Sequence, residues 1–400
     1  RRTSCSSTRS RSSRWLMRCS RAKRSMPRRC AGLWPGSLLV SPTSRRRQKV
    51  RLVRAARPVR PRSVHRSCRR SRRDRLLRSR LLAAGTLTGS RAAFLPPSER
   101  ARFSHLTSSP VSLRRRFTVP LPNGQSLQLG GRTLVMGVLN ITPDSFSDGG
   151  AHTDLARAID DGVRMVDEGA DLLDIGGEST RPGARPVSAD EERRRVIPVI
   201  EGLARRVSVP LSVDTYKATV AAAGLDAGAA IINDISGLRF EPALADVVAQ
   251  RSAGLVLMHT RGRPASMMQQ ATYHEVVDEV RDELRESLAF ATGAGVSASR
   301  ILLDPGIGFA KEAAHSFEVV ARLDEFAELG RPLVVGPSRK SFLTKAIGAS
   351  VPPAERDLAT AAAVTACVLG GAHIVRVHAV GTLRDVVRVA DEIRRYHRAD

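Results

Sequence analysis

Cysteine is nearly absent from most of this 400-residue sequence, and long uncharged apolar runs are absent throughout. Four of the five cysteines lie in the first 68 residues, and Cys367 alone occurs after them. A single cysteine excludes a disulfide framework in the last 300 residues and fits a reducing compartment. No apolar run approaches the roughly 20 residues of a membrane-spanning helix, and no secretory signal is visible. These absences lead us to expect a cytoplasmic protein without a membrane partner.

Acidic residues are nearly missing from the first 100 positions, which hold Asp74 and Glu99 against 30 lysines and arginines. These positions therefore carry +28, whereas the remaining 300 residues carry −2 of the total net charge of +26. Sequence so rich in arginine and serine cannot bury enough apolar surface to fold, so we expect residues 1–115 to be a disordered basic leader. Nucleic-acid binding, which the total charge suggests, is expected only through this leader.

The leader has three competing interpretations. It could be a transit peptide, which would direct the protein to an organelle, or a basic arm that binds nucleic acid. It could also be upstream sequence translated from a wrongly set start, because the chain begins with Arg1 rather than Met. We favour the third interpretation, since dense arginine without any pattern is what GC-rich DNA gives outside its coding frame.

Ordered structure is expected from residue 116 onward. The alternating runs 117–121 and 125–129 flank Pro122-Asn123-Gly124, a sequence typical of a β-hairpin turn. Eight apolar runs of strand length follow, and they start 20 to 46 residues apart, which leaves room for a helix in every gap. The eight runs are 134–140, 172–177, 211–215, 231–236, 255–259, 301–306, 333–336 and 374–378.

The gaps between these runs contain apolar stripes with helical spacing. Two stripes are clear: Leu155, Ile159, Val163 and Val166, and Leu383, Val386, Val387, Ala390 and Ile393. Eight βα units in about 265 residues predict an α/β fold, a (β/α)8 TIM barrel that spans residues 116–400 and begins with the short hairpin. A doubly wound open sheet is the alternative, but no GxGxxG turn follows the first strand.

Polar residues end the predicted strands, and in a TIM barrel the strand ends form the site at the C-terminal mouth. A carboxylate inside a strand that is covered on both faces is costly unless it is paired. Each such residue could be a structural cap or an ion-pair partner, but together they converge on one mouth. They are Asn140, Asp174, Asp214, Asn233 with Asp234, His259, Asp304, Ser338-Arg339-Lys340, and Arg376 with His378.

Two kinds of chemistry are suggested by these strand ends. Asp214, Asn233, Asp304 and Lys340 offer acceptors and donors that suit a flat heterocycle with amide-like edges. A second set, Asn140, Arg376 and His378, lies on strands one and eight, which become neighbours when a barrel closes. These three residues suit an anion or a metal phosphate, and the helix that starts near Gly381 would add its N-terminal dipole. The loops 176–185 and 337–342 are also expected at this mouth, where a substrate role is favoured.

Eight motifs in chain order resemble those of dihydropteroate synthase, the pterin-binding enzyme of folate biosynthesis. They are NITPDSFSDGG, DIGGESTRPGA, SVDT, IND, LMH, DPGIGF, SRKSF and RVH, within residues 117–397. The resemblance implies the condensation of 6-hydroxymethyl-7,8-dihydropterin diphosphate with 4-aminobenzoate, which releases diphosphate. It also implies Mg²⁺ as cofactor, a homodimer, and competition by sulfonamides at the aminobenzoate pocket.

The resemblance implies specific roles as well. The catalytic residues would be Asp214, Asp304, Lys340, Arg376 and His378. Pterin would be held by Asp214, Asn233, Asp304 and Lys340, and diphosphate by Asn140, Arg376 and His378, with Asn140 also meeting Mg²⁺. The aminobenzoate pocket would be lined by Phe146, Thr180, Arg181, Pro182, Phe309 and Ser338. No serine or cysteine nucleophile motif is visible, which agrees with a reaction that needs no covalent intermediate.

Two positions depart from the family pattern. Ala379 follows His378 where the family often has Asp, and this change could loosen the orientation of His378. Ala310 precedes Lys311 where the family often has Gly, and we expect little effect if the φ of Ala310 is negative. Two rival functions remain open: a pterin-binding barrel that transfers a methyl group from methyltetrahydrofolate to a corrinoid, and a synthase-like protein without catalytic activity. The intact STRPGA and SRKSF loops argue against methyl transfer.

Overall fold

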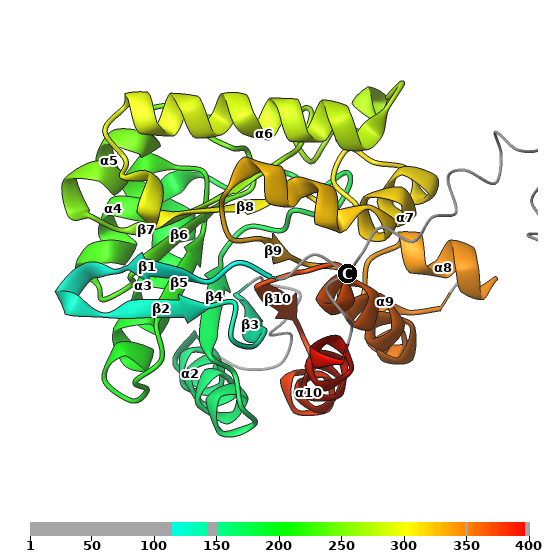
Figure 1. The fold of residues 1–400 in the computed structure, drawn as a ribbon. Coiled ribbons are helices and arrows are strands. Elements are labelled where there is room, and N and C mark those ends of the chain that lie inside the picture. Colours follow the sequence, from blue (N-terminus) through cyan, green and yellow to red (C-terminus); the bar gives the residue numbers. More distant parts are fainter. Residues whose placement is uncertain (1–113, 142–150, 349–350, 397–400) are drawn as a thin grey trace, which may run out of the picture. The chain divides into compact units, whose positions relative to one another are not determined.

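Eight parallel strands surrounded by helices form the centre of the protein, which is described here from a computed structural model (Figure 1). The structure describes residues 114–141, 151–348 and 351–396, all within the unit 90–400. Residues 1–113 of the expected leader and Phe146 of the expected aminobenzoate pocket lie outside the described residues.

The strands follow one another around the barrel in chain order. The ladder runs β8-β7-β6-β5-β4-β3-β10-β9, so the first and last barrel strands, β3 and β10, are hydrogen-bonded neighbours. A parallel bridge between Leu303 and Leu333 brings β8 to β9 and nearly closes the barrel. The strands are β3 (Leu134–Asn140), β4 (Leu172–Gly176), β5 (Leu211–Asp214), β6 (Ile231–Asp234), β7 (Gly254–Met258), β8 (Ile301–Asp304), β9 (Val334–Val335) and β10 (Ile374–Val377).

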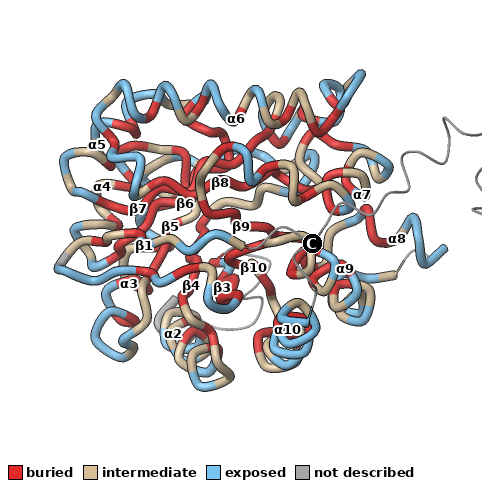
Figure 2. Tube along the Cα trace, in the orientation of Figure 1, coloured by how far each residue is buried: buried red, intermediate tan, exposed pale blue. Residues whose placement is uncertain are grey.

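Helices occupy each gap between consecutive strands, as the spacing predicts. They are α2 (Ala151–Asp167), α3 (Ala189–Ala204), α4 (Ala218–Asp226), α5 (Leu244–Arg251), α6 (Val276–Gly293), α7 (Ala313–Ala321), α8 (Phe342–Ile347) and α9 (Asp357–Leu369), with α10 (Val380–Arg395) after the last strand. Figure 2 shows the strands buried and the helices exposed on their outer faces. No helix among the described residues is long and apolar enough to cross a membrane.

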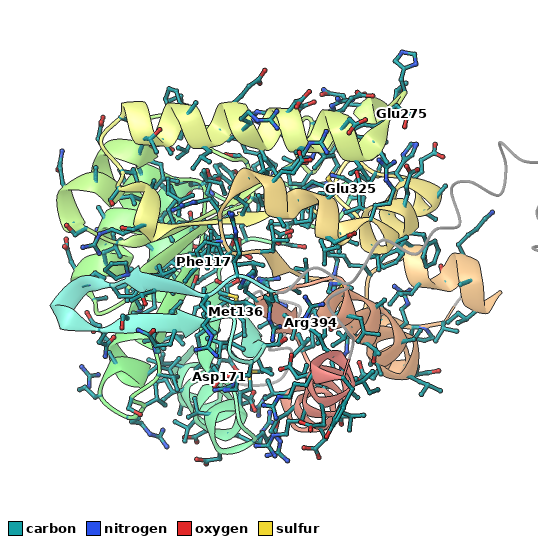
Figure 3. The ribbon with its side chains drawn as sticks, in the orientation of Figure 1. Phe117, Met136, Asp171, Glu275, Glu325 and Arg394 are labelled. Atoms are coloured by element: carbon teal, nitrogen blue, oxygen red, sulfur yellow. The ribbon has the colours of Figure 1, made fainter. Side chains whose placement is uncertain are left out.

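The N-terminal hairpin closes one end of the barrel. Its strands are β1 (Phe117–Pro120) and β2 (Ser126–Leu129), joined by a 3-10 turn at Pro122–Gly124. The buried hairpin residues pack in one cluster with Met136 and other side chains that point into the barrel. Figure 3 labels Phe117 and Met136, which both belong to this packing. The hairpin thus covers the end of the barrel at which the strands begin, so a site can open only at the opposite end, where the strands finish.

The predicted elements are confirmed, with small differences at their ends. Most strands are one or two residues shorter than predicted, and several of the residues lost from their ends are glycines, namely Gly177, Gly306 and Gly336. In the predicted stripe on α10, Leu383, Val387 and Ala390 are buried, but Ile393 is exposed. The helix therefore turns this last residue away from the core.

Candidate active site

Alternation along the strands decides which polar residues enter the barrel. Residues paired in register point to the same side of a sheet, and Met136 of the interior cluster is paired with Arg376. The same parity directs Asp174, Asp214, Asn233 and Asp304 inward. Asn233 and its neighbour Asp234 must therefore face opposite sides of β6.

The Asp234 carboxylate has a structural role on the outer side. It accepts hydrogen bonds from the backbone nitrogens of Ser236 (2.8 Å) and Leu238 (2.6 Å) and from the Ser236 hydroxyl (2.7 Å). Burial raises its pKa to about 6, although these hydrogen bonds oppose the shift. Asp234 thus caps the loop that follows β6, and only Asn233 is available to the barrel interior.

One arginine lies between two carboxylates at the centre of the site. The Nε of Arg376 donates to Oδ2 of Asp174 (2.6 Å), and its Nη2 donates to Oδ2 of Asp214 (2.7 Å). Asn233 donates its amide Nδ2 to the same oxygen of Asp174 (2.9 Å), while the other oxygen of Asp174 is buried without a described partner. Burial raises the pKa of Asp214 to about 7, and Arg376 opposes the shift. Asp174, to which the sequence analysis assigned no role, is therefore part of the site.

A second group surrounds Asp304 at the end of β8. Its Oδ1 accepts from the backbone nitrogen of Gly306 (2.7 Å), which fixes the orientation of the carboxylate. Gly306 has φ +69°, and a Cβ there would lie 1.9 Å from the carbonyl oxygen of His259, so glycine is required. Lys340 donates its Nζ to the carbonyl of Ile307, and burial lowers its pKa to about 8. The Asp304 carboxylate and the Lys340 amine interact electrostatically in this buried pocket.

His378 lies at the mouth beside Ser338. The Ser338 hydroxyl accepts from the backbone nitrogen of His378 (3.3 Å) and lies 3.0 Å from its Nδ1. Burial, with Arg376 and Arg339 nearby, lowers the pKa of His378 to about 3, so the imidazole is neutral at pH 7. If the hydroxyl donates to Nδ1, Nε2 carries the proton and becomes a donor. His378 would then bind an anion through an N–H group rather than through charge.

The start of α10 already has a carboxylate at its backbone nitrogens. Glu168 accepts from the Gly381 nitrogen (3.2 Å) and is held by Arg164 (3.0 Å). Ala379, at the cap position, provides no side-chain hydrogen bond to the helix. A cavity of about 430 Å³ beside it is lined by His378, Ala379 and Gly381, among other residues. The expected contribution of this helix dipole to anion binding therefore competes with Glu168.

The loop between β4 and α3 reaches a second, larger cavity. Pro182, which is exposed on this loop, lines a cavity of about 690 Å³ together with Gly308 and Ser341. Thr180 is half-buried, Arg181 is exposed, and Phe309, which is half-buried, lies 4.4 Å below the Lys340 amine, measured to the ring centroid. Ser338 instead packs inward against His378, so Ser341 is the serine of this turn that reaches the cavity. The sequence alone offers no signal that separates the two serines.

A buried lysine was also missed by the sequence analysis. Lys311 is 3% exposed, and its Nζ lies 2.8 Å from Nδ1 of His259 and donates to the carbonyl of Phe309 (3.3 Å). Burial lowers its pKa well below the ordinary value. His259 in turn contacts Glu283 through Nε2 (3.1 Å), and burial lowers the histidine pKa to about 3. The lysine after the DPGIGF motif could have suggested this chain of contacts, but its burial could not be read from the sequence.

Ala310 adopts a left-handed backbone, which contradicts the negative φ on which our expectation for it depended. Its φ is +45°, and its carbonyl accepts from the Tyr273 hydroxyl (2.9 Å). The methyl group is therefore strained at this position. Asn140, the expected contact to Mg²⁺, ends β3 and is exposed at the mouth. Among the described residues, no cluster of three or more His, Cys, Asp or Glu could hold a metal ion.

Proteins to which this chain is similar include pterin-binding enzymes and several dihydropteroate synthases. The pterin binding enzyme family matches residues 136–378. The dihydropteroate synthase of a Synechocystis species is 46% identical over 280 residues, which cover 70% of this chain and 96% of that protein. The family match runs from within β3 to the residue after β10 and does not include the basic leader.

Two solved structures extend this comparison to ligand complexes. The Xanthomonas albilineans enzyme with 4-aminobenzoic acid is 44% identical with a TM-score of 0.64, and the alignment covers 69% of this chain and 98% of that one. The Yersinia pestis enzyme with a sulfonamide drug is 40% identical with a TM-score of 0.65, and covers 70% and 100% of the two chains. The chain therefore belongs to the pterin-binding enzyme family and, within it, to the dihydropteroate synthases, which are transferases of folate biosynthesis.

Proposed function

We propose that this chain joins 6-hydroxymethyl-7,8-dihydropterin diphosphate to 4-aminobenzoate at the barrel mouth, through the residues described above. The observation that supports this most is the inward set Asp174, Asp214, Asn233 and Asp304, in which Arg376 binds Asp174 and Asp214 and Asn233 binds Asp174. A pterin presents N–H groups along one edge, and carboxylate and amide oxygens are suitable acceptors for them. Asp214, Asn233 and Asp304 accept from the ring, and Lys340 donates to it.

The diphosphate binds next to Arg376 and His378 in this proposal. Arg376 uses Nε and Nη2 for the two carboxylates, and its Nη1 has no hydrogen-bond partner among the described residues. That nitrogen can donate to a diphosphate oxygen while the other two hold the guanidinium in place. The neutral imidazole of His378 adds a second donor.

Mg²⁺ fits this site as an ion that arrives with the diphosphate. A magnesium ion keeps several waters and is commonly bound through one or two protein oxygens plus substrate phosphates, so a single exposed amide oxygen at Asn140 is compatible with it. When bound, the ion neutralises charge on the leaving diphosphate. Asn140 would hold it at the end of β3.

The reaction then requires only that these side chains stabilise charge. The bond from the pterin methylene carbon to the diphosphate oxygen breaks, and its electron pair leaves with diphosphate, which Arg376 and His378 stabilise. The pterin ring delocalises the positive charge that develops beside the Asp214 and Asp304 carboxylates. The amine nitrogen of 4-aminobenzoate forms the new C–N bond and passes its extra proton to solvent water. The second substrate is held by Thr180, Arg181, Pro182 and Phe309 together with two serines after β9, Ser338 beside His378 and Ser341 at the cavity. Phe146 stays a prediction.

Diphosphate release from the full chain tests the proposal. Release should depend on 4-aminobenzoate, and Arg376→Ala should lower turnover by about 10²-fold or more, because a preorganised cation contributes roughly 2 to 4 kcal/mol to the transition state. A pterin methyltransferase would bind the pterin without any dependence on aminobenzoate, and a non-catalytic relative would bind both substrates without release. If the Arg376→Ala protein turns over like wild type, the diphosphate binds elsewhere.

We also infer a homodimer in the cytoplasm. Val389, Ile393 and Tyr396 are 61%, 47% and 81% exposed at the spacing of one face of α10, and Leu358 of the neighbouring α9 is 86% exposed. Apolar surface of this kind suits a second copy of the chain. Sedimentation equilibrium should give a dimer, and the double substitution Val389→Glu with Ile393→Glu should dissociate it.

The proposed location in the cytoplasm agrees with the single described cysteine. Cys367 is buried and free, as a reducing compartment allows.

A further inference from the structure

A buried group of charged residues lies beneath the loop that carries the proposed aminobenzoate contacts. The loop consists of residues 177–188, between β4 and α3, and has no helix or strand of its own. Long loops without secondary structure need specific anchors if they are to hold a substrate. One anchor is at the tip, where the Gly183 nitrogen donates to the carbonyl of Pro264 (3.0 Å).

One carboxylate links the two ends of the loop. Glu178, the second residue of the loop, accepts from the backbone nitrogen of Val187 (3.1 Å), nine residues further on. Its other oxygen accepts from the Tyr216 hydroxyl (2.9 Å). Glu178 therefore joins the two ends of the loop to each other and ties both to the segment after β5.

Lys217 connects this carboxylate to the next helix. Its Nζ donates to Oε2 of Glu178 (2.5 Å) and also to Oε2 of Glu192 in the first turn of α3. The side chains of Glu178, Lys217 and Glu192 are only 7%, 11% and 1% exposed. Inside a protein, loss of the one cation would leave two carboxylates close together without compensation, so the three groups act as a unit.

We propose that Glu178 and Lys217 are positioning residues that hold the loop 177–188 in the shape that binds 4-aminobenzoate. This inference rests on the proposed function, which assigns Thr180, Arg181 and Pro182 to that substrate. Neither Glu178 nor Lys217 needs to contact the substrate. Their effect is to keep the loop from sampling open conformations, so that binding does not have to order it.

The substitutions Glu178→Gln and Lys217→Met test this inference in the full chain. Gln keeps the size of the side chain but replaces one accepting oxygen with a donor, and Met keeps the length of the lysine stem without its charge. Each should raise KM for 4-aminobenzoate about tenfold or more, while kcat at saturation and the Kd for pterin diphosphate stay within twofold of wild type. Lys217→Arg, which can still bridge two carboxylates, should recover most of the wild-type KM. Glu201→Gln, an exposed carboxylate on the same α3, is the matched control and should change nothing.

Hydrogen exchange separates this inference from the proposed function. Amides of residues 179–187 should exchange faster in Glu178→Gln and Lys217→Met than in wild type, with thermal midpoints showing that the variants are folded. Equal increases in KM for both substrates, or unchanged loop exchange, would overturn the inference. If wild type releases no diphosphate, the proposed function is wrong, and loop exchange then decides alone whether the anchor exists.

Discussion

Arg376 is paired with two buried carboxylates, so the protonation of these two acids determines the net charge of the site. The group of Arg376, Asp174 and Asp214 would carry −1 if both acids were ionised. Burial makes that excess charge costly, and it raises the pKa of Asp214 to about 7 although Arg376 opposes the shift. The acceptor proposed for the pterin is thus close to half-protonated at neutral pH.

Pterin affinity should therefore rise with pH around neutrality. The ionised carboxylate accepts N–H groups more strongly than the protonated acid does, so below pH 7 Asp214 has to lose a proton to bind the pterin best, and affinity should fall by up to about tenfold per pH unit. Titration calorimetry with 6-hydroxymethyl-7,8-dihydropterin, which carries no diphosphate to titrate, measures this between pH 6 and 8. Asp214→Asn should bind weakly with a flat profile.

The contribution of Asp214 to folding stability should change with pH in the opposite direction, falling as pH rises. The folded pKa of Asp214 lies above the ordinary value of 3.8, so the native state binds more protons than the unfolded state between about pH 4 and 7. The contribution of Asp214 to stability is therefore fully present at low pH and is lost as pH rises through 7. If affinity and stability both rise with pH, Asp214 is not the group that links them.

Lys340 is expected to act through its geometry as well as its charge. Its Nζ reaches the Ile307 carbonyl and lies above the Phe309 ring, so the amine has a fixed position on a flexible stem. The planar fork of arginine would not fit there, and Lys340→Arg should weaken pterin diphosphate binding almost as much as Lys340→Ala. Arg339→Lys should be milder for this ligand, because Arg339 is paired with Asp357 (2.7 Å). Calorimetry decides, and wild-type affinity in Lys340→Arg would mean that charge alone matters.

At the scale of elements, the turn after β8 stores strain next to the site. Ala310 has φ +45°, a conformation that costs an L-residue roughly 1 to 2 kcal/mol, whereas its buried methyl group contributes roughly 0.8 kcal/mol. Strain is the larger of the two effects. Ala310→Gly should therefore leave stability unchanged or increase it slightly, by up to about 1 kcal/mol.

Denaturant unfolding checks this prediction against a matched helix position. Ala289→Gly, an exposed site inside α6, should lose roughly 0.5 to 1 kcal/mol because glycine is unfavourable in a helix. A loss of 1.5 kcal/mol or more in Ala310→Gly would contradict the strained conformation. It would indicate that the methyl packing outweighs the backbone.

At the scale of the whole molecule, the barrel is anchored by residues just before the hairpin. Arg114 has a side chain only 5% exposed, pairs with Asp391 (2.8 Å) and donates to the carbonyl of Ala372 (2.7 Å). The Nε2 of His373, the residue before β10, lies 3.0 Å from the carbonyl oxygen of Arg115. This contact ties the same segment to the start of β10. The folded body therefore includes two residues that were assigned to the leader.

Truncation should separate the leader from this anchor. Removal of residues 1–109 should leave turnover and thermal midpoint nearly unchanged, because Arg114 stays. Arg114→Ala in the shortened chain should cost about 3 kcal/mol, since Asp391 would lose its buried cation. Scanning calorimetry measures both. A large loss in the shortened chain that retains Arg114 would show that folding depends on the leader.

Periodicity and strand-end chemistry allowed most of the fold to be predicted from the sequence. Apolar runs marked all eight strands because a strand covered on both faces must be almost wholly apolar, and their spacing allowed only crossover helices. The apolar character of these strands also made Asp214, Asp304 and Arg376 stand out, because a charged residue in a buried strand is costly unless it is paired. The order of the motifs then indicated the family.

Tertiary structure alone decided what these residues contact. A sequence does not give side-chain direction across a loop, so Ser338 and Ser341 could be separated only when one was buried against His378 and the other reached the cavity. Nor does it give the φ of Ala310 or the burial of Lys311, both of which depend on segments packed from elsewhere in the chain. Arg376 is 202 positions from Asp174 and 162 positions from Asp214 in the sequence. The three side chains meet only because the barrel closes and brings β10 next to β3.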